Sequence, residues 1–335
     1  MMFIFGAVEV ISPDQMFSIN SEVDFKKLAL ATFRYQAKEN EVYSRYLELL
    51  GVAVNEVDTV EQIPFLPIDL FKSQSIICGT NEPQIIFSSS RTTGFVQSKH
   101  PVKDILVYID SFRKGFYHFY GGISDYTILA LLPSYLERDG SSLIYMVDDL
   151  INESKNPLSG YFLHNHDELN SILLRLKTEK KKTILIGVTY ALLDFTEAFT
   201  INFPELIVME TGGMKGKRKE LIKEELHQLL CKGFGVEDIH SEYGMTELLS
   251  QAYSQGKGIF KTPPWMRVLV RDTNDPFSIL EPGKTGGLNI IDLANIYSCS
   301  FIATQDLGRR HEDGSFEVLG RFDNSDIRGC NLLVQ

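Results

Sequence analysis

This chain of 335 residues has few long apolar runs, few basic residues relative to acidic ones and few cysteines. No apolar run approaches the ~20 residues of a membrane span, and the short apolar start at 1–8 lacks the basic flank of a signal peptide. Basic residues number 33 against 44 acidic ones, and the net charge of -11 argues against nucleic acid as the main partner. The four cysteines are widely scattered: Cys78, Cys231, Cys299 and Cys330. Because they form no CxxC or Cys/His spacing, we expect free thiols in a reducing cytoplasm, with no disulfide framework or zinc site.

Strands and helices alternate through the middle of the sequence, which predicts an α/β fold with a largely parallel sheet. We expect strands at 126–132, 183–188 and 206–209, and helices at 168–177, 189–195 and 218–231. Two helices are expected within 24–50. After 251, shorter alternating segments separated by Asp-Pro, Pro-Gly and Gly-Gly turns indicate a β-rich part. Ligands of α/β folds lie at the carboxyl ends of strands, so candidate site residues are expected there.

The stretch 241–247 places an aromatic ring, a glycine, a hydroxyl and a carboxylate within five residues. A strand is predicted before it at 234–239 and a helix after it at 248–252. Tyr243 can stack on a purine, Gly244 allows close backbone approach, Thr246 can contact phosphate, and Glu247 can bind Mg²⁺ through oxygen. An ordinary turn with this sequence by chance is the alternative.

A second polar stretch follows a predicted buried strand at 83–87 and contains four serine or threonine hydroxyls, an arginine and a glycine. Its candidate phosphate-binding residues are Ser89, Ser90, Arg91, Thr92, Thr93 and Gly94. Backbone N–H groups and hydroxyls in such a loop can surround a phosphate. The Walker pattern is absent, and a Ser/Thr-rich surface turn is the alternative.

Two charged residues are predicted at later strand ends, and one cysteine stands near the end of the chain. The Asp306 carboxylate can accept both hydroxyls of a ribose, and Arg321 can stabilise charge developing on a phosphate. The alternative is an ordinary ion pair between surface turns. Cys330 lies in a polar, glycine-flanked segment where Arg328 can lower its pKa, which suits an acyl-accepting thiol; an inert thiol is the alternative. His240 could position substrate or serve as a structural histidine.

Four of these stretches occur in one order, at 89–94, 243–247, 304–307 and 320–323. They resemble the phosphate loop and the three later core motifs of the adenylate-forming superfamily, which includes acyl- and aryl-CoA ligases. Within it, the sequence resembles the acyl-protein synthetase (LuxE-like) branch. The segments that carry this likeness are 63–72, 132–142, 187–190, 210–213 and 325–330.

The resemblance implies a large adenylate-forming N-terminal domain, with stacked sheets flanked by helices and a small β-rich subdomain. It implies a helical part at 1–80, the α/β core at 81–255 and the β-rich subdomain at 256–335. It also implies a reaction in which a carboxylic acid, fatty or long-chain, attacks ATP in the presence of Mg²⁺ to give an acyl-adenylate. The acyl group then passes to a thiol, either Cys330 or a thiol of a partner such as a reductase, acyltransferase or carrier protein.

Site roles follow from the resemblance residue by residue. The loop at 89–94 would hold the phosphates, and Gly212 and Gly213 would line the adenine and acyl region. Tyr243 would flank adenine, Thr246 would contact phosphate and Glu247 would bind Mg²⁺. Asp306 would hold the ribose hydroxyls, and Arg321 the ribose–phosphate side.

Two departures from the superfamily pattern keep other functions open. Arg91 stands where superfamily loops usually have glycine, and the sequence stops at Gln335, without the ~100-residue mobile domain of CoA ligases. One alternative is therefore a weak or inactive subunit that binds nucleotide or acyl ligand within a larger complex. Another is a CoA ligase whose mobile domain comes from a second chain. The sequence leaves the identity of the acid open.

Overall fold

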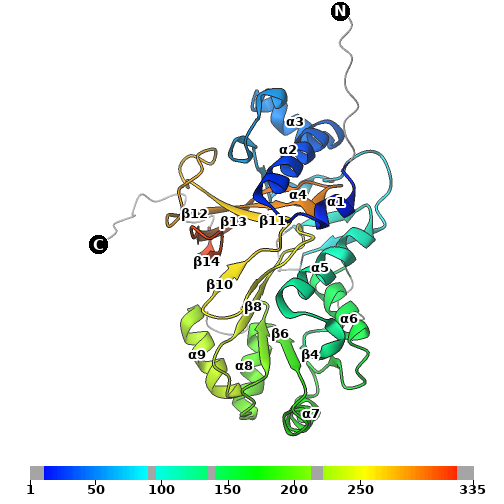
Figure 1. The fold of residues 1–335 in the computed structure, drawn as a ribbon, viewed down its shortest axis with the longest axis vertical. Coiled ribbons are helices and arrows are strands. Elements are labelled where there is room, and N and C mark those ends of the chain that lie inside the picture. The colour runs from blue at the N-terminus through cyan, green and yellow to red at the C-terminus, as the bar shows by residue number, and fades with distance from the viewer. Residues whose placement is uncertain (1–10, 90–95, 135–139, 213–221, 323–335) are drawn as a thin grey trace, which may run out of the picture.

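A twelve-stranded mixed sheet runs through the computed structural model of the protein, which describes residues 11–89, 96–134, 140–212 and 222–322. Figure 1 shows this sheet with helices packed along it. The described strand order is β11-β12-β13-β14-β10-β9-β8-β7-β6-β4-β5, with β1 pairing to β13. A separate pair, β2 and β3, forms a hairpin.

The strands of the described residues are β1 (Leu66–Pro67), β2 (Ile85–Ser88), β3 (Lys99–Val102), β4 (Thr127–Leu131), β5 (Gly160–Tyr161), β6 (Thr183–Gly187), β7 (Ile207–Glu210), β8 (His240–Tyr243), β9 (Ala252–Ser254), β10 (Ile259–Lys261), β11 (Met266–Arg271), β12 (Thr285–Asp292), β13 (Phe301–Arg310) and β14 (Phe316–Arg321). The α-helices are α1 (Pro13–Phe17), α2 (Glu22–Glu39), α3 (Glu41–Leu49), α4 (Leu70–Ser73), α5 (Ile105–Tyr120), α6 (Ser142–Ser154), α7 (His166–Thr178), α8 (Thr189–Ala198) and α9 (Lys223–Phe234). The 3-10 turns are η1 (Val54–Glu56), η2 (Val60–Gln62), η3 (Ile123–Asp125) and η4 (Leu293–Asn295).

The half of the sheet from β5 to β8 is parallel and covered on both faces. Every residue of β4 and β6 is buried, as expected for parallel strands under helices. Alternate residues enter two different cores: Ile128 packs with α5 and α6, whereas Leu129 packs with α7, α8 and α9. The parallel α/β fold predicted from the sequence is confirmed.

The other half of the sheet, from β9 to β14, is antiparallel and continues the parallel half through the β8–β9 pair. The predicted β-rich region is therefore joined to the parallel strands in one sheet. Helices α2 and α3 lie over the β11–β13 end in Figure 1. Gln36 of α2 donates to the Asn295 and Ile296 carbonyls at 2.9 and 3.0 Å, which ties that helix to the segment between β12 and β13.

Three local predictions were wrong, for reasons of strand pairing, helix length and long-range hydrogen bonding. The strand expected at 83–87 is not buried, because β2 pairs only with β3 and leaves Ile86 50% exposed. The strand expected at 234–239 starts later, because α9 extends to Phe234 and ends at Gly235, whose φ of +68° suits glycine. The helix expected at 248–252 is absent, because the N–H groups of Leu249 and Ser250 donate to buried Asp292.

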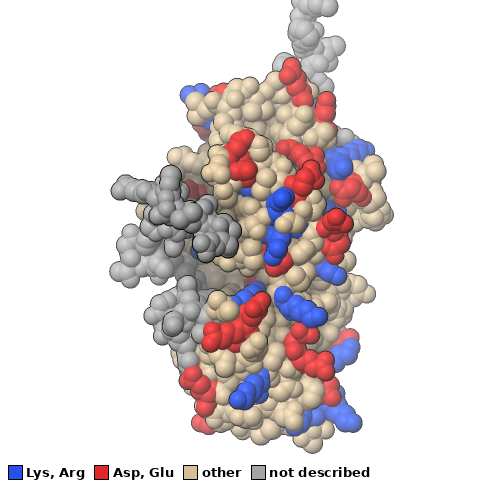
Figure 2. All heavy atoms as spheres, turned by 90° about the vertical axis from the view of Figure 1, so that its left-hand side faces the viewer, with Lys and Arg blue, Asp and Glu red and all other residues tan. Residues whose placement is uncertain are grey.

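None of the helices in the described residues is long and apolar enough to cross a lipid bilayer. On the face drawn in Figure 2, the lysines, arginines, aspartates and glutamates of the described residues are interspersed over the surface. They form no continuous basic area there, in keeping with the net charge of -11.

Candidate active site

Three residues from separate sequence motifs meet where β8 lies near β13 and β14. The Tyr243 hydroxyl donates to Asp306 Oδ2 at 2.8 Å, and Arg321 Nε donates to Asp306 Oδ1 at 3.0 Å. Asp306 and Arg321 are direct cross-strand partners, and Asp306 lies inside β13 instead of at the predicted strand end. Asp306 is 5% exposed, whereas the Arg321 side chain is 76% exposed and free to meet a ligand. Burial, then the Asp306 charge, raise the pKa of Tyr243 well above 10.0, so its O–H remains a donor.

Glu247 lies beside the stem of the β2–β3 hairpin. Burial raises the pKa of its carboxyl group, while the neighbouring Ser98 side chain and the charges of Arg321 and Lys72 lower it. Ser98 N–H donates to Ser89 Oγ and Ser89 N–H donates to the Ser98 carbonyl, both at 3.0 Å. The stem of the predicted phosphate loop is thus next to the predicted metal-binding carboxylate.

His100, which the sequence did not indicate, links the hairpin to the 243–247 stretch. Its Nδ1 lies 2.9 Å from the Thr246 carbonyl and its Nε2 2.9 Å from Ser298 Oγ. Because a carbonyl oxygen only accepts, Nδ1 carries the proton and Nε2 accepts from the serine hydroxyl. Burial lowers the pKa of His100 to about 4, so the ring is neutral.

A buried polar network fixes the residues that follow Glu247. Asp292 accepts from the N–H groups of Leu249 and Ser250 at 2.8 Å each, and Asn295 Nδ2 donates to the Glu247 carbonyl at 2.7 Å. These side chains pair with the backbone N–H groups of Leu249 and Ser250 and with the Glu247 carbonyl. The segment therefore does not need the hydrogen bonds of a helix. The sequence showed Asp292 and Asn295 only as polar residues after a strand.

Glu210 is a second buried carboxylate that sequence reasoning missed, and it holds the Gly212 turn. Gly212 has a φ of +71°, and its N–H donates to Glu210 Oε2 at 2.7 Å. Lys223 Nζ lies 3.3 Å from Glu210 Oε1, and His227 Nε2 lies 3.8 Å from it. Although burial acts to raise it, the pKa of Glu210 falls to about 2 because His227, Lys223 and the Gly212 N–H stabilise the charged form.

The remaining predicted residues divide into described and undescribed ones. Gly244 is exposed, directly after β8, and Thr246 is half-buried. His240 contacts the Tyr120 hydroxyl through Nδ1 at 3.2 Å, and burial lowers its pKa. The predicted residues outside the described part of the structure are Ser90, Arg91, Thr92, Thr93, Gly94, Gly213 and Cys330.

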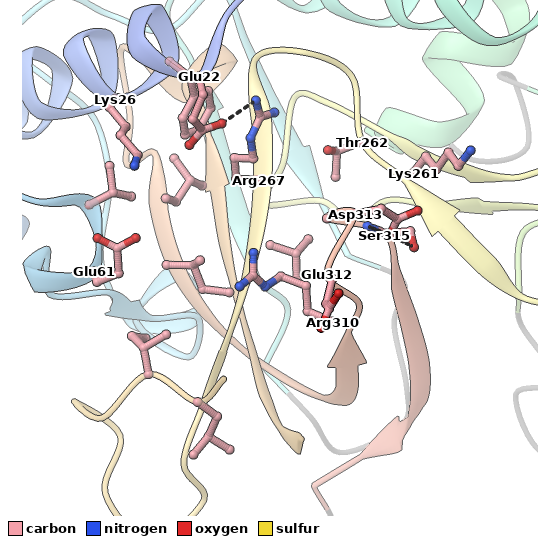
Figure 3. Close-up of a pocket in the computed structure, with 18 of the residues that line it drawn as sticks. Glu22, Lys26, Glu61, Lys261, Thr262, Arg267, Arg310, Glu312, Asp313 and Ser315 are labelled. Carbon is pink, nitrogen blue, oxygen red and sulfur yellow. Dashed lines mark hydrogen bonds and ion pairs between the residues drawn. The ribbon is translucent and has the colours of Figure 1, made fainter. Parts of the chain in front are cut away.

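A cavity of about 970 Å³ lies elsewhere, between the start of α2, β11 and the turn that joins β13 to β14. None of the predicted site residues lines it. Figure 3 shows Arg267 pointing to Glu22, with which it forms an ion pair of 3.4 Å, and Lys26, Glu61 and Arg310 facing the cavity. Because side chains of both signs line it, the cavity does not select one charge of ligand.

Comparison with known proteins decides the family. The sequence matches the family described as "Acyl-protein synthetase, LuxE" over residues 144–335, which is more than half of the chain. The chain belongs to the acyl-protein synthetase LuxE family. A search of curated proteins found no match.

Solved structures similar to this LuxE family member include a CoA ligase and an ATP-bound protein. An open form of 2-hydroxyisobutyryl-CoA ligase in complex with 2-HIB-AMP and CoA has a TM-score of 0.65 at 14% identity, covering 95% of this chain and 75% of the ligase chain. ATP-bound MatB from Rhodopseudomonas palustris has a TM-score of 0.53 at 17% identity, covering 72% of this chain and 49% of the MatB chain. At these identities the likeness shows the fold, and it confirms the fold class predicted from the sequence.

The described residues fit a nucleotide and a magnesium ion. Each Asp306 oxygen accepts one hydrogen bond and keeps lone-pair capacity for a ribose hydroxyl. No group of three or more His, Cys, Asp or Glu side chains in the described residues could hold a metal ion, so no all-protein cage is formed there. Mg²⁺ is commonly held by one or two carboxylates together with substrate phosphates and water. Glu247 suits that role, since a cation would favour the charged form that burial disfavours.

Proposed function

We propose that this LuxE family member uses ATP to activate a carboxylic acid, fatty or long-chain, as an acyl-adenylate and transfers the acyl group to a thiol. The observation that carries the proposal is the contact between Tyr243, Asp306 and Arg321, which come from three separate motifs. Asp306 is buried in this cluster and the Arg321 side chain is exposed. Asp306, which would hold a ribose, and the exposed Arg321, which would meet a phosphate, are in contact there. The free thiols of Cys78, Cys231 and Cys299 accord with a reducing cytoplasm as its compartment.

In the first step a carboxylate oxygen of the acid forms a bond to the α-phosphorus of ATP. The bond from that phosphorus to the oxygen bridging to the β-phosphate breaks, and pyrophosphate leaves with the electron pair. Asp306 would hold the ribose, Arg321 would stabilise the charge developing on the α-phosphate, and Thr246 would contact phosphate. Mg²⁺ bound at Glu247 would neutralise charge on the phosphate oxygens.

In the second step the sulfur of a thiol attacks the acyl carbonyl carbon. The bond to the adenylate oxygen breaks, AMP leaves with that electron pair, and the thiol proton passes to solvent. We propose Cys330 as the acceptor, or a thiol on a reductase, acyltransferase or carrier-protein partner. A thioester formed this way retains the energy of the adenylate for later transfer.

Carboxylate-dependent exchange of pyrophosphate into ATP tests the first step. The acids to assay are butanoate, octanoate, dodecanoate and hexadecanoate. We expect exchange with the longer acids, at least about a hundredfold lower in Glu247→Gln, the loss typical of removing one electrostatic stabiliser. Glu82→Gln, which removes an exposed carboxylate, is the matched control.

Labelled acyl transfer tests the second step. Label that stays on the wild-type protein but not on Cys330→Ser would assign the acceptor. Label that reaches only a partner protein would place the acceptor there. If ATP binds and no acid supports exchange, the chain would instead be a non-catalytic, ligand-binding subunit.

A further inference from the structure

Glu242 lies directly before Tyr243 and faces the other side of β8. Side chains alternate along a strand, so Tyr243 points toward Asp306 while Glu242 points toward the α5 side of the sheet. Its carboxyl group bends to the end of the strand, because a Cβ built on Gly244 would collide with Glu242 Oε1. Glu242 thus places a carboxyl group at the end of β8, beside Gly244.

The groups that face Glu242 supply no positive charge. Tyr253 is its cross-strand partner on β9, Tyr108 and Tyr120 face it from α5, and Glu210 faces it from β7. No described residue donates a hydrogen bond to the Glu242 carboxyl group or forms an ion pair with it. Glu242 is half-buried, so a ligand at the end of β8 can reach its unpaired carboxyl group.

Glu210 and Glu242 are neighbouring carboxyl groups whose pKa values are shifted in opposite directions. Burial, then the negative charge of Glu210, raise the pKa of Glu242 to about 8, whereas the pKa of Glu210 is lowered to about 2. Glu210 therefore carries its charge at neutral pH and Glu242 carries a proton. When the environments of two carboxyl groups separate their pKa values in this way, one commonly acts as a proton-bearing acid and the other stays ionised.

We propose that Glu242 binds the acid substrate by donating a hydrogen bond from its carboxyl group to the substrate carboxylate at the end of β8. The inference rests on the proposed function and deepens it, because it assigns the residue that receives the acid. Tyr243, Asp306 and Arg321 lie on the other face of β8, so the two substrates would approach the end of this strand from opposite sides. A protonated Glu242 attracts an anionic acid, whereas an ionised one would repel it.

This arrangement predicts that acid binding weakens in alkaline solution. Burial raises the pKa of the three facing tyrosines, so they stay neutral, and Glu210 stays charged. Burial lowers the pKa of His240, two residues before Glu242, so the ring is already neutral. Among the described groups that face this site, Glu242 is the one that titrates near pH 8.

The test is the KM for dodecanoate in pyrophosphate exchange, measured from about pH 7 to about pH 9.5. In the wild type we expect it to rise about tenfold per pH unit above about pH 8, because the protonated fraction falls at that rate. The ATP KM should show no such rise. Glu242→Gln has a similar shape and an amide donor but cannot ionise, so its KM should be independent of pH.

Glu242→Ala removes the donor and should raise the KM at neutral pH roughly tenfold or more, the loss expected for a hydrogen bond to a charged group. A wild-type KM that stays flat, or an alkaline rise that persists in Glu242→Gln, would overturn this inference while leaving the proposed function standing. A wild type without exchange for any acid at any pH would overturn both. Far-UV circular dichroism checks that each variant is folded.

Discussion

Asp292 offers a direct test of the network that shapes the site. This buried carboxylate at the end of β12 accepts four hydrogen bonds. Oδ2 accepts from the N–H groups of Leu249 and Ser250, both at 2.8 Å. Oδ1 accepts from the Ser250 hydroxyl at 2.5 Å and from the Ala294 N–H at 3.0 Å. Asp292→Asn keeps the size of the side chain and replaces one acceptor oxygen by an NH₂ donor.

The expected loss of stability is set by the orientation of the new amide that leaves fewer groups without a hydrogen-bond partner. If the NH₂ group replaces Oδ1, the Ser250 hydroxyl can turn to accept from it and only the Ala294 N–H loses its partner. One buried, unpaired N–H costs about 1–3 kcal/mol, so we expect Asp292→Asn to lower the free energy of unfolding by about 2 kcal/mol. Asp292→Ala removes both acceptor atoms and should cost about 4 kcal/mol or more.

Urea unfolding followed by circular dichroism measures both variants. Asp58→Asn changes an exposed aspartate and should stay within about 0.5 kcal/mol of the wild type. If Asp292→Asn were as stable as the wild type, or if Asp292→Ala cost no more than Asp292→Asn, the network would not be what holds residues 248–250.

Two further predictions concern His100 and Tyr243. The pKa of His100 is lowered from 6.5 to about 4, so the unfolded chain takes up a proton in this range that the folded protein does not. The contribution of His100 to stability should therefore fall by roughly 3 kcal/mol as the pH drops from about 6.5 to about 4. Relative to His100→Gln, the free energy of unfolding of His118→Gln, measured in urea at both pH values, should fall by that amount, and an equal pH dependence of the two variants would contradict the assignment. Tyr243→Phe removes the hydroxyl that donates to Asp306 and should cost about 1.5–3 kcal/mol of unfolding free energy and raise the KM for ATP. Tyr117→Phe, a change at an exposed tyrosine, is its control, and equal stability of the two variants would mean that the Tyr243–Asp306 bond contributes nothing.

Local sequence patterns were sufficient for the long, regular elements. The continuous apolar runs of β4 and β6 predict buried parallel strands, and the structure has them under helices on both faces. The stretches at 243–247, 304–307 and 320–323 could be chosen as functional because they combine unusual polar residues. The LuxE-like resemblance, which other segments of the sequence carry, is confirmed by the LuxE match over residues 144–335.

Long-range contacts decided the features that local patterns missed. Residues 248–252 have the apolar content of a helix, yet Asp292 and Asn295 satisfy their backbone from more than 40 positions away. His100 contacts Thr246 and Ser298, which are 146 and 198 positions away in the sequence. No periodicity within a short window can reveal such partners.

Residue type and local spacing were enough to predict the α/β class, the family and the residues with distinctive chemistry. The contact between Tyr243, Asp306 and Arg321, and the opposite shifts in the pKa of Glu210 and Glu242, follow from the tertiary structure. A carboxyl group's protonation depends on its burial and on the charges packed against it, and both are set by strands that are remote in sequence and adjacent in the sheet.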